Sequence, residues 1–269
     1  MADLTVVILT YNEEKNIADC INSIRKLANR IVVIDSESTD KTIQIAEDSG
    51  AEVIVHPWEG FAKQFNWALD NCNINTEWVF RLDADERITK ELCEEIVSVL
   101  NNENSDEYMA FALHWRMYFM GKELKHGGAG KNYVVRLFRL GKARVEDKEM
   151  DESLIVDGKC GKLKNPFIHF DYKSLDVWLN KHIWYSNLEL SMYFGVQTRD
   201  SLSTPQNKRR GFYYKLPLFV RAKFYYWYRY YFQLGFLDGK EGKIFCFLQA
   251  YWFRFLVDAK IYEKKVKHK

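Results

Sequence analysis

The first hundred residues alternate between short apolar runs and segments with helical spacing. Residues 4–10, 30–35 and 51–55 are continuous apolar or β-branched runs. Such runs are typical of strands that are buried on both faces of a parallel sheet. A fourth run, residues 78–81, comes just before Asp83. The pattern therefore predicts four strands in the first third of the chain.

Each of these runs is followed by a segment with helical periodicity. The first segment repeats apolar residues on one helix face: Ile17, Cys20, Ile21, Ile24 and Leu27. Asn12 is its predicted N-cap, and Thr89 is the predicted N-cap of a helix over 89–100. Residues 60–71 form a further predicted helix. Alternating strands and helices predict an α/β fold with a doubly wound, mostly parallel sheet and right-handed crossovers.

Polar side chains follow three of the predicted strands. Tyr11 and Asn12 follow the first, Asp35 ends the second, and Asp83 and Asp85 follow the fourth. Parallel strands end at one edge of a sheet, and ligands bind there. Tyr11 is suited to stack on a base, Asp35 to accept from a base N–H, and Asp83 to accept from a ribose hydroxyl. This edge is therefore a predicted nucleotide site.

Asp83 and Asp85 form a D-x-D pattern, and on an extended chain both side chains point the same way. Two neighbouring carboxylates stay ionised when a cation lies between them, and Mg²⁺ or Mn²⁺ bound to a phosphate is such a cation. The alternative is a solvated acidic turn that opens the next helix. No G-x-G-x-x-G follows the first strand and no P-loop motif occurs, which argues against dinucleotide-binding and P-loop proteins.

Composition places the protein in a reducing compartment. The chain has 269 residues, which suits one large α/β domain or one domain with an appendage. Its five cysteines are scattered and never in C-x-x-C spacing, which argues against a disulfide framework and a zinc site. Acidic Glu13 and Glu14 follow the first apolar run, so we expect no signal peptide. The predicted location is the cytoplasm.

Charge and aromatic residues are unevenly distributed. Residues 206–269 hold 15 Lys and Arg against 4 Asp and Glu, whereas the first 205 residues hold 24 against 33. The same tail holds 20 of the 42 aromatic residues. Basic and aromatic residues interleave over 212–236, and 244–262 is a predicted amphipathic helix. This pattern favours a helix in a membrane interface; the alternative is a helix packed on the core. No RNP-like motif supports nucleic-acid binding.

Three segments together resemble a known enzyme family: VVILTYNEEKNI, IVVIDSESTD and WVFRLDADERI. They are similar to the inverting GT-A glycosyltransferases of family 2, and most of all to the lipopolysaccharide-core β-1,4-glucosyltransferase type. Later segments extend the resemblance over nearly the whole chain: NYVVRLFRLGKARVEDKEMDESL, IHFDYKSLDVWLNKHIWYSN and GFLDGKEG. The resemblance implies a GT-A fold with a Rossmann-like nucleotide-binding half.

The resemblance also implies the roles of individual residues. The nucleotide sugar would be held by Leu9, Tyr11, Asn12, Asp35, Lys63, Asp83 and Ala84. Asp85 would bind Mg²⁺ or Mn²⁺, and His169 would reach the metal or the pyrophosphate, although a lone histidine on an apolar strand is usually a core residue. Ser36 stands where many relatives have a second aspartate, and Glu37 stands where glycine is common.

The catalytic base is expected among the five carboxylates of residues 144–152. Inversion at a sugar carbon needs a carboxylate that takes the proton of the attacking hydroxyl. The family's motif ends in a His-Glu pair, and Asp151 and Glu152 stand in its place. Glu152 is therefore the predicted base and Asp151 the second choice. Glu146 and Asp147 are further alternatives, and the remaining carboxylates are interpreted as a solvated loop.

These observations predict a catalytic domain over 1–205 and a helical, membrane-associating region over 206–269. Within the first, residues 1–104 would bind the nucleotide sugar and 105–205 the acceptor. The expected reaction transfers a hexose, with UDP-glucose as the expected donor, to a lipid-linked lipopolysaccharide-core or other surface-glycan acceptor. The enzyme would lie on the inner face of the cell membrane. A sugar nucleotidyltransferase and a non-catalytic membrane-surface binding protein remain alternatives.

Overall fold

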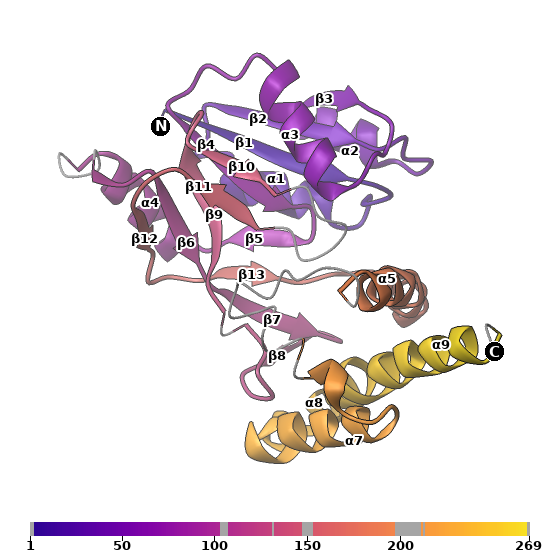
Figure 1. Ribbon diagram of the computed structural model, residues 1–269. Helices are drawn as coiled ribbons and strands as arrows, with labels where there is room; N and C mark the ends of the chain where they lie inside the picture. The colour runs from indigo at the N-terminus through magenta and orange to yellow at the C-terminus, as the bar shows by residue number, and fades with distance from the viewer. Residues whose placement is uncertain are drawn as a thin grey trace. The chain divides into compact units, whose positions relative to one another are not determined.

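A computed structural model describes residues 3–102, 107–130, 132–146, 153–196, 211 and 213–267 of the chain (Figure 1). It forms two compact units. The first consists of Met1–Gly121 and Gly130–Tyr172, and the second of Lys122–Ala129 and Lys173–Lys269. The chain thus passes into the second unit at residue 173, ahead of the predicted functional boundary at 205. That division into catalytic and membrane-associating regions stays a prediction.

The first unit is built on a mostly parallel sheet. Among the described residues this sheet has seven strands in the order β12-β6-β9-β4-β1-β2-β3. Strand β1 pairs in parallel with β2 and β4, β2 pairs in parallel with β3, and β9 is antiparallel to β4 and β6. The strands are β1 (Leu4–Thr10), β2 (Arg30–Asp35), β3 (Glu52–Val55), β4 (Trp78–Asp83), β6 (Ala110–Leu113), β9 (Val134–Arg139) and β12 (Cys160–Lys162).

Helices cover both faces of this sheet, which explains why its strands β1, β2 and β4 are buried along most of their length (Figure 1). Val6 and Ile8 of β1 pack in one cluster with Ile21 of α1, whereas Val7 packs in a second cluster with Phe65 of α3. The four helices are α1 (Ile17–Ile24), α2 (Thr42–Asp48), α3 (Phe61–Asn71) and α4 (Lys90–Leu100). The predicted doubly wound α/β fold is confirmed.

Two predicted helix caps have different outcomes. Thr89 is the N-cap of α4, and its hydroxyl accepts a hydrogen bond from the Leu92 N–H at 3.1 Å. The prediction for Asn12 is wrong, since α1 begins at Ile17 with Asn16 at its N-cap. Asn12 instead has a φ of 52°. Its amide oxygen accepts from the Thr39 N–H at 2.8 Å, so Asn12 fixes the loop after β2.

Smaller elements of the first unit surround the end of β4. Strand β13 (Phe167–His169) pairs antiparallel with β5 (Glu86–Ile88) and parallel with β7 (Trp115–Phe119). Strands β10 (Ala143–Val145) and β11 (Leu154–Val156) form an antiparallel pair. Strands β4 and β5 are joined by a tight turn at Ala84 and Asp85. We expected an extended D-x-D from the sequence, but the chain turns at Ala84 and Asp85.

The second unit is mainly helical. It contains β8 (Lys122–Leu124), α5 (Leu175–Val196), α7 (Val220–Trp227), η2 (Tyr228–Phe232), η3 (Gly235–Asp238), α8 (Gly239–Cys246), η4 (Phe247–Trp252) and α9 (Phe253–Lys267). Segments η2 and η4 are π-helical. Tyr193 of α5 packs with Phe253, Val257 and Ile261 in its core. Within the described part of the chain, no helix has the length and apolar character needed to cross a membrane.

Candidate active site

The ends of β1, β2 and β4 bring the predicted site residues to one edge of the sheet. The strand register sets Thr10 beside Asp35 and Leu9 beside Asp83. Tyr11, which follows β1, is exposed. Because these strands are parallel neighbours, their carboxyl ends meet where ligands bind in open α/β sheets. The sequence prediction of a common edge is thus met by the strand order.

Asp35 is fully buried at this edge and organises the loop that follows it. Its carboxylate accepts hydrogen bonds from the Thr10 hydroxyl at 2.8 Å, the Ser38 N–H at 2.7 Å and the Ser38 hydroxyl at 2.6 Å. Glu37 in the same loop has a φ of 62°, a conformation that glycine adopts without strain. A carboxylate has about four acceptor positions, and these hydrogen bonds to Asp35 use three of them.

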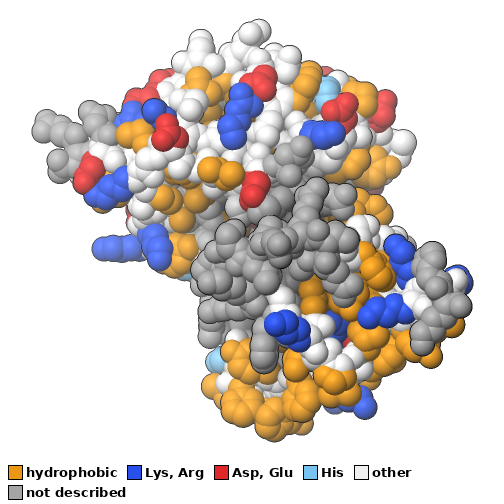
Figure 2. All heavy atoms as spheres, in the orientation of Figure 1, with side chains coloured by type: hydrophobic (Ala, Val, Ile, Leu, Met, Phe, Trp, Pro, Cys, Tyr) orange, Lys and Arg blue, Asp and Glu red, His pale blue; other side chains and the backbone are white. Residues whose placement is uncertain are grey.

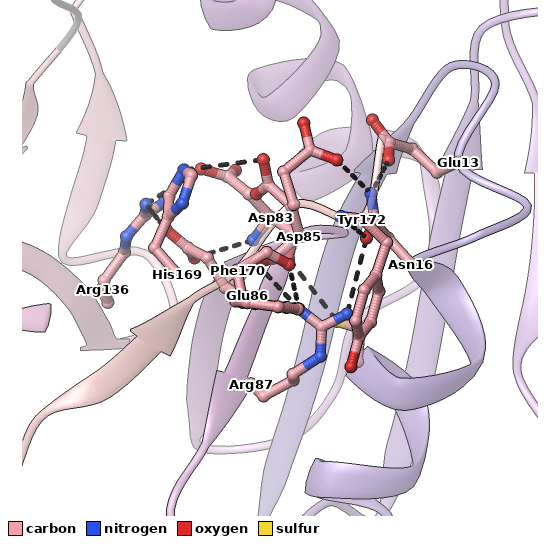
Figure 3. Close-up of polar contacts among 12 residues, drawn as sticks. Glu13, Asn16, Asp83, Asp85, Glu86, Arg87, Arg136, His169, Phe170 and Tyr172 are labelled. Atoms are coloured by element: carbon pink, nitrogen blue, oxygen red, sulfur yellow. Dashed lines mark hydrogen bonds and ion pairs between the residues drawn. The ribbon is translucent and has the colours of Figure 1, made fainter. Parts of the chain in front are cut away.

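Asp83 and Glu86 share one partly buried cation (Figure 3). The Arg136 guanidinium lies 2.9 Å from the Asp83 carboxylate and 2.6 Å from that of Glu86. Glu86 also accepts a hydrogen bond from the Asp83 N–H at 2.9 Å. Strand β9, which carries Arg136, lies beside β4, so sheet order brings these three residues together. The Asp83 side chain keeps 40% of its surface exposed.

The charges within this cluster differ for physical reasons. Burial alone would raise the pKa of Asp83, but the guanidinium groups of Arg136 and Arg81 outweigh it and hold that pKa well below its usual range. Burial raises the pKa of Glu86 above its usual range, against the attraction of Arg136. Burial would lower the pKa of Arg136, but Asp83 and Glu86 raise it. The cluster therefore holds one firmly ionised carboxylate at its exposed end.

Asp85 and His169 form the second pair of the site. Asp85 Oδ2 lies 3.5 Å from His169 Nε2, and Nδ1 of the same ring is buried without a hydrogen-bond partner. A carboxylate oxygen and an imidazole nitrogen this close suit Mn²⁺, or Mg²⁺ with phosphate and water as its other ligands. No group of three or more His, Cys, Asp or Glu residues is arranged to hold a metal among the described residues. The donor set thus fits an ion that a bound phosphate completes.

Arg87 and Asn16 form hydrogen bonds with the backbone next to this pair (Figure 3). Arg87 Nη1 donates to the Asp85 carbonyl at 3.1 Å and to the Phe170 carbonyl at 2.5 Å. Buried Asn16 accepts from the Tyr172 N–H at 3.0 Å. These bonds fix the backbone on both sides of the pair, at Asp85 and just after His169.

No role was predicted from the sequence for Arg136, Arg87 or Asn16. A signal for Arg136 was available, since an arginine inside the apolar run 133–139 is rarely buried unless it is paired. Arg87 and Asn16 gave no comparable signal because their partners lie far away in the sequence.

Several predicted residues are not joined to these clusters. Lys63 is exposed on the first turn of α3, and no hydrogen bond or ion pair of the described residues links it to Asp83 or Asp85. Ala84 is buried in the turn between the two aspartates. Asp147, Asp151 and Glu152 lie outside the described residues.

Glu146, the remaining candidate for the base, lies at the end of the described range 132–146. Its N–H donates to the Ser153 carbonyl at 3.0 Å. The segment that contains the predicted base therefore connects the paired strands β10 and β11.

Comparison with known proteins identifies the family. Residues 5–141 match glycosyl transferase family 2. The chain belongs to this family. A Rickettsia felis glycosyltransferase is 30% identical over 285 residues, which cover 100% of this chain and 93% of that protein. A Rickettsia typhi glycosyltransferase is 32% identical over 70% of this chain, and the match spans 66% of that protein.

A relative with a more specific name also matches over nearly the full length. The lipopolysaccharide core biosynthesis glycosyltransferase LpsC of Rhizobium meliloti is 28% identical over 97% of this chain and 92% of its own. Among solved structures, Staphylococcus aureus TarS covers 97% of this chain and 91% of its own, with 14% identity and a TM-score of 0.48. Glucosyl-3-phosphoglycerate synthase from Mycobacterium tuberculosis covers 45% and 44%, with 24% identity and a TM-score of 0.35. The family-2 resemblance is confirmed.

Proposed function

We propose that this chain transfers a hexose from a nucleotide diphosphate sugar, with UDP-glucose as the expected donor, to a lipid-linked lipopolysaccharide-core or other surface-glycan acceptor, and that it inverts the anomeric carbon. The observation that supports this most is the meeting of Asp35, Asp83 and Asp85 at the carboxyl edge of one parallel sheet. The name of the Rhizobium meliloti relative LpsC supports the acceptor class.

The donor nucleotide would lie across the ends of β1, β2 and β4. Tyr11 would stack on the base, and Asp35 would accept from its N–H beside the loop that it holds. Asp83 suits a ribose hydroxyl, because its low pKa keeps it an acceptor at neutral pH. Leu9, Asn12 and Ala84 would shape the pocket through their backbone, and Lys63 would approach the phosphates.

Asp85 and His169 would hold the divalent ion, Mg²⁺ or Mn²⁺. When bound, the ion supplies Lewis-acid stabilisation of the leaving diphosphate. The chain's own part is positional, since Arg87 fixes the Asp85 carbonyl and Arg136 keeps Asp83 and Glu86 from repelling each other. These contacts would pre-organise Asp85 and His169 for an ion that carries a phosphate ligand.

Glu152 would take the proton from the acceptor hydroxyl, with Asp151 as the second choice. The hydroxyl oxygen then bonds to the anomeric carbon as the bond from that carbon to the diphosphate breaks, which inverts the carbon. One base suffices because no sugar–enzyme adduct forms, unlike the two-carboxylate arrangement of retaining glycosidases. The C-terminal region, 206–269, would hold the enzyme on the inner membrane face where a lipid-linked acceptor resides.

A thermal-shift series tests the proposal. UDP-glucose with Mn²⁺ is expected to raise the midpoint of unfolding above the midpoint with either ligand alone, because a ligand that binds only the folded state stabilises it by mass action. Asp85→Asn should remove the Mn²⁺-dependent part, and the exposed Asp48→Asn serves as the matched control. No shift with any nucleotide sugar would contradict the proposal. Pyrophosphate release from UTP and a sugar phosphate would favour a nucleotidyltransferase.

A further inference from the structure

Helix α7 and the π-helical turn η2 expose aromatic side chains along one side. The exposed residues recur every three or four positions, twice as adjacent pairs: Val220, Phe224, Trp227 with Tyr228, and Tyr231 with Phe232. We call these six residues the aromatic face. Phe224 and Phe232 are 63% and 64% exposed. Helices of water-soluble proteins bury such side chains and expose their charged residues.

The π-helical turn keeps the aromatic face continuous. A π-helix has a wider turn than an α-helix, so residues five apart come together on one side. The Trp227 ring lies 4.9 Å from that of Phe232 and 6.0 Å from that of Tyr231. The Tyr228 and Phe232 rings are 6.4 Å apart. The exposed rings therefore form one surface rather than scattered positions.

The opposite side of the same helix carries buried arginines. Arg221 Nε lies 2.7 Å from Asp258 Oδ1 of α9, and both side chains are fully buried. Arg229 Nε donates to the Gly127 carbonyl at 2.5 Å, and its guanidinium lies 5.4 Å from the Phe245 ring. A buried charge that loses its partner is strongly unfavourable. The helix cannot turn its aromatic face inward without unpairing both arginines, so these contacts hold that face outward.

The turn after η2 extends this apolar surface. Leu234, Phe236 and Leu237 are all exposed. Leu234 has a φ of 59°, which is uncommon for a leucine. Strained backbone persists where the surroundings fix it, and such positions often serve a function. In Figure 2 the hydrophobic side chains gather over the C-terminal helices at the lower end of the view.

Exposed lysines accompany this surface: Lys215, Lys223, Lys240 and Lys243. Two of the acidic residues of the same region, Asp238 and Asp258, are buried. The outside of these helices is therefore both apolar and positively charged. This combination complements an anionic lipid surface, which attracts lysine and accepts aromatic rings.

We infer that the aromatic face binds the interface of an anionic lipid bilayer. Trp and Tyr rings would lie at the depth of the headgroups, where both residue types are enriched in membrane proteins. The flanking lysines would contact anionic headgroups. Because the arginine side packs within its own unit, the helix lies in the membrane plane. The inference rests on the proposed function, for which it names the surface that meets the membrane.

Vesicle flotation of the full-length protein tests this inference. Binding is expected to vesicles of phosphatidylcholine with phosphatidylglycerol. The double variant Trp227→Ala/Phe232→Ala should weaken it by about tenfold or more, because two large apolar side chains leave the interface. Lys223→Ala should weaken it by about fivefold on anionic vesicles, and should leave binding to phosphatidylcholine vesicles unchanged.

Trp58→Ala is the matched control, since Trp58 is 42% exposed and Trp227 is 51% exposed. This control variant should bind as the native chain does. Three results would overturn the inference: no binding of the native chain to anionic vesicles, unchanged binding by the double variant, or a dimer that the double variant dissociates. The last result would show a second copy of this chain on the aromatic face.

A second readout separates this inference from the proposed reaction. UDP-glucose affinity without vesicles should be the same for the native chain and the double variant, which also shows that the variant is folded. If UDP-glucose does not bind but vesicles do, the proposed reaction fails and the membrane surface stands. If UDP-glucose binds and vesicles do not, the membrane surface fails alone.

Discussion

The two units of this protein use the same ion pair, arginine with carboxylate, in opposite settings. In the first unit Arg136 joins Asp83 and Glu86, and the Asp83 side chain keeps 40% of its surface exposed. In the second unit Arg221 and Asp258 are 0% and 1% exposed. The first pair is open at one end, where a ligand has access. The second is closed on all sides and fixes which side of a helix faces outward.

The largest expected effect tests the open site. Asp85→Asn should lower the transfer rate by about 10³-fold, because a neutral side chain holds the cation poorly and Lewis-acid stabilisation contributes several kcal/mol. UDP release from UDP-glucose with a lipid-linked acceptor measures it. The exposed Asp48→Asn is the control. A rate within threefold of the native rate would show that Asp85 binds no catalytic metal.

The closed pair should govern stability rather than activity. Asp258→Ala leaves the buried Arg221 charge without its carboxylate and should lower the free energy of unfolding by about 3–5 kcal/mol. Urea unfolding measures the loss. Replacing both partners, with Arg221→Met and Asp258→Leu, should recover much of it. Glu263→Ala, which breaks an exposed pair with Lys267, should change nothing measurable. A similar loss of stability in Glu263→Ala would show that burial does not decide how much an ion pair contributes.

An intermediate effect is expected at Arg136. Arg136→Gln removes the cation that joins Asp83 to Glu86, leaves Arg81 at 4.0 Å from Asp83, and should lower the free energy of unfolding by about 1–3 kcal/mol. Water reaches Asp83, so the loss should be smaller than for Asp258→Ala, and added Mn²⁺ should restore part of it. Lys90→Gln, at an exposed pair with Glu94, is the control. A larger loss of stability than for Asp258→Ala would mean that water does not reach the cluster of Asp83, Glu86 and Arg136.

The smallest expected effect concerns a half-buried histidine of the second unit. Burial lowers the pKa of His182, which stacks on Trp178 at 3.5 Å. Below about pH 6.5 the unfolded chain then binds this proton more readily than the folded chain, so stability falls as the pH drops. His182→Gln should flatten that fall, as thermal unfolding between about pH 7 and 5 would measure. An unchanged slope would show that His182 is not protonated on unfolding.

Local sequence predicted the secondary structure well where the signal lay within a few residues. The apolar runs gave β1, β2 and β4, and Thr89 gave the start of α4. Asn12 failed as a helix cap because its amide bonds to Thr39, which is 27 residues away. The segment of Asp151 and Glu152 was predicted from family resemblance alone, and that assignment stays a prediction.

The sequence by itself determined the α/β class, the common edge of Asp35, Asp83 and Asp85, and a tail rich in basic and aromatic residues. These follow from the periodicity and the residue types of short segments of the chain. Tertiary structure decided that β9 brings Arg136 to Asp83 and that Asp258 draws Arg221 inward. The interleaved basic and aromatic residues of the tail are compatible with either side of the helix facing outward. Arg221 pairs with Asp258 and Arg229 bonds to the Gly127 carbonyl, so both arginines face inward and the aromatic rings face outward. The free energy lost by burying an unpaired charge is larger than that lost by leaving an apolar ring exposed.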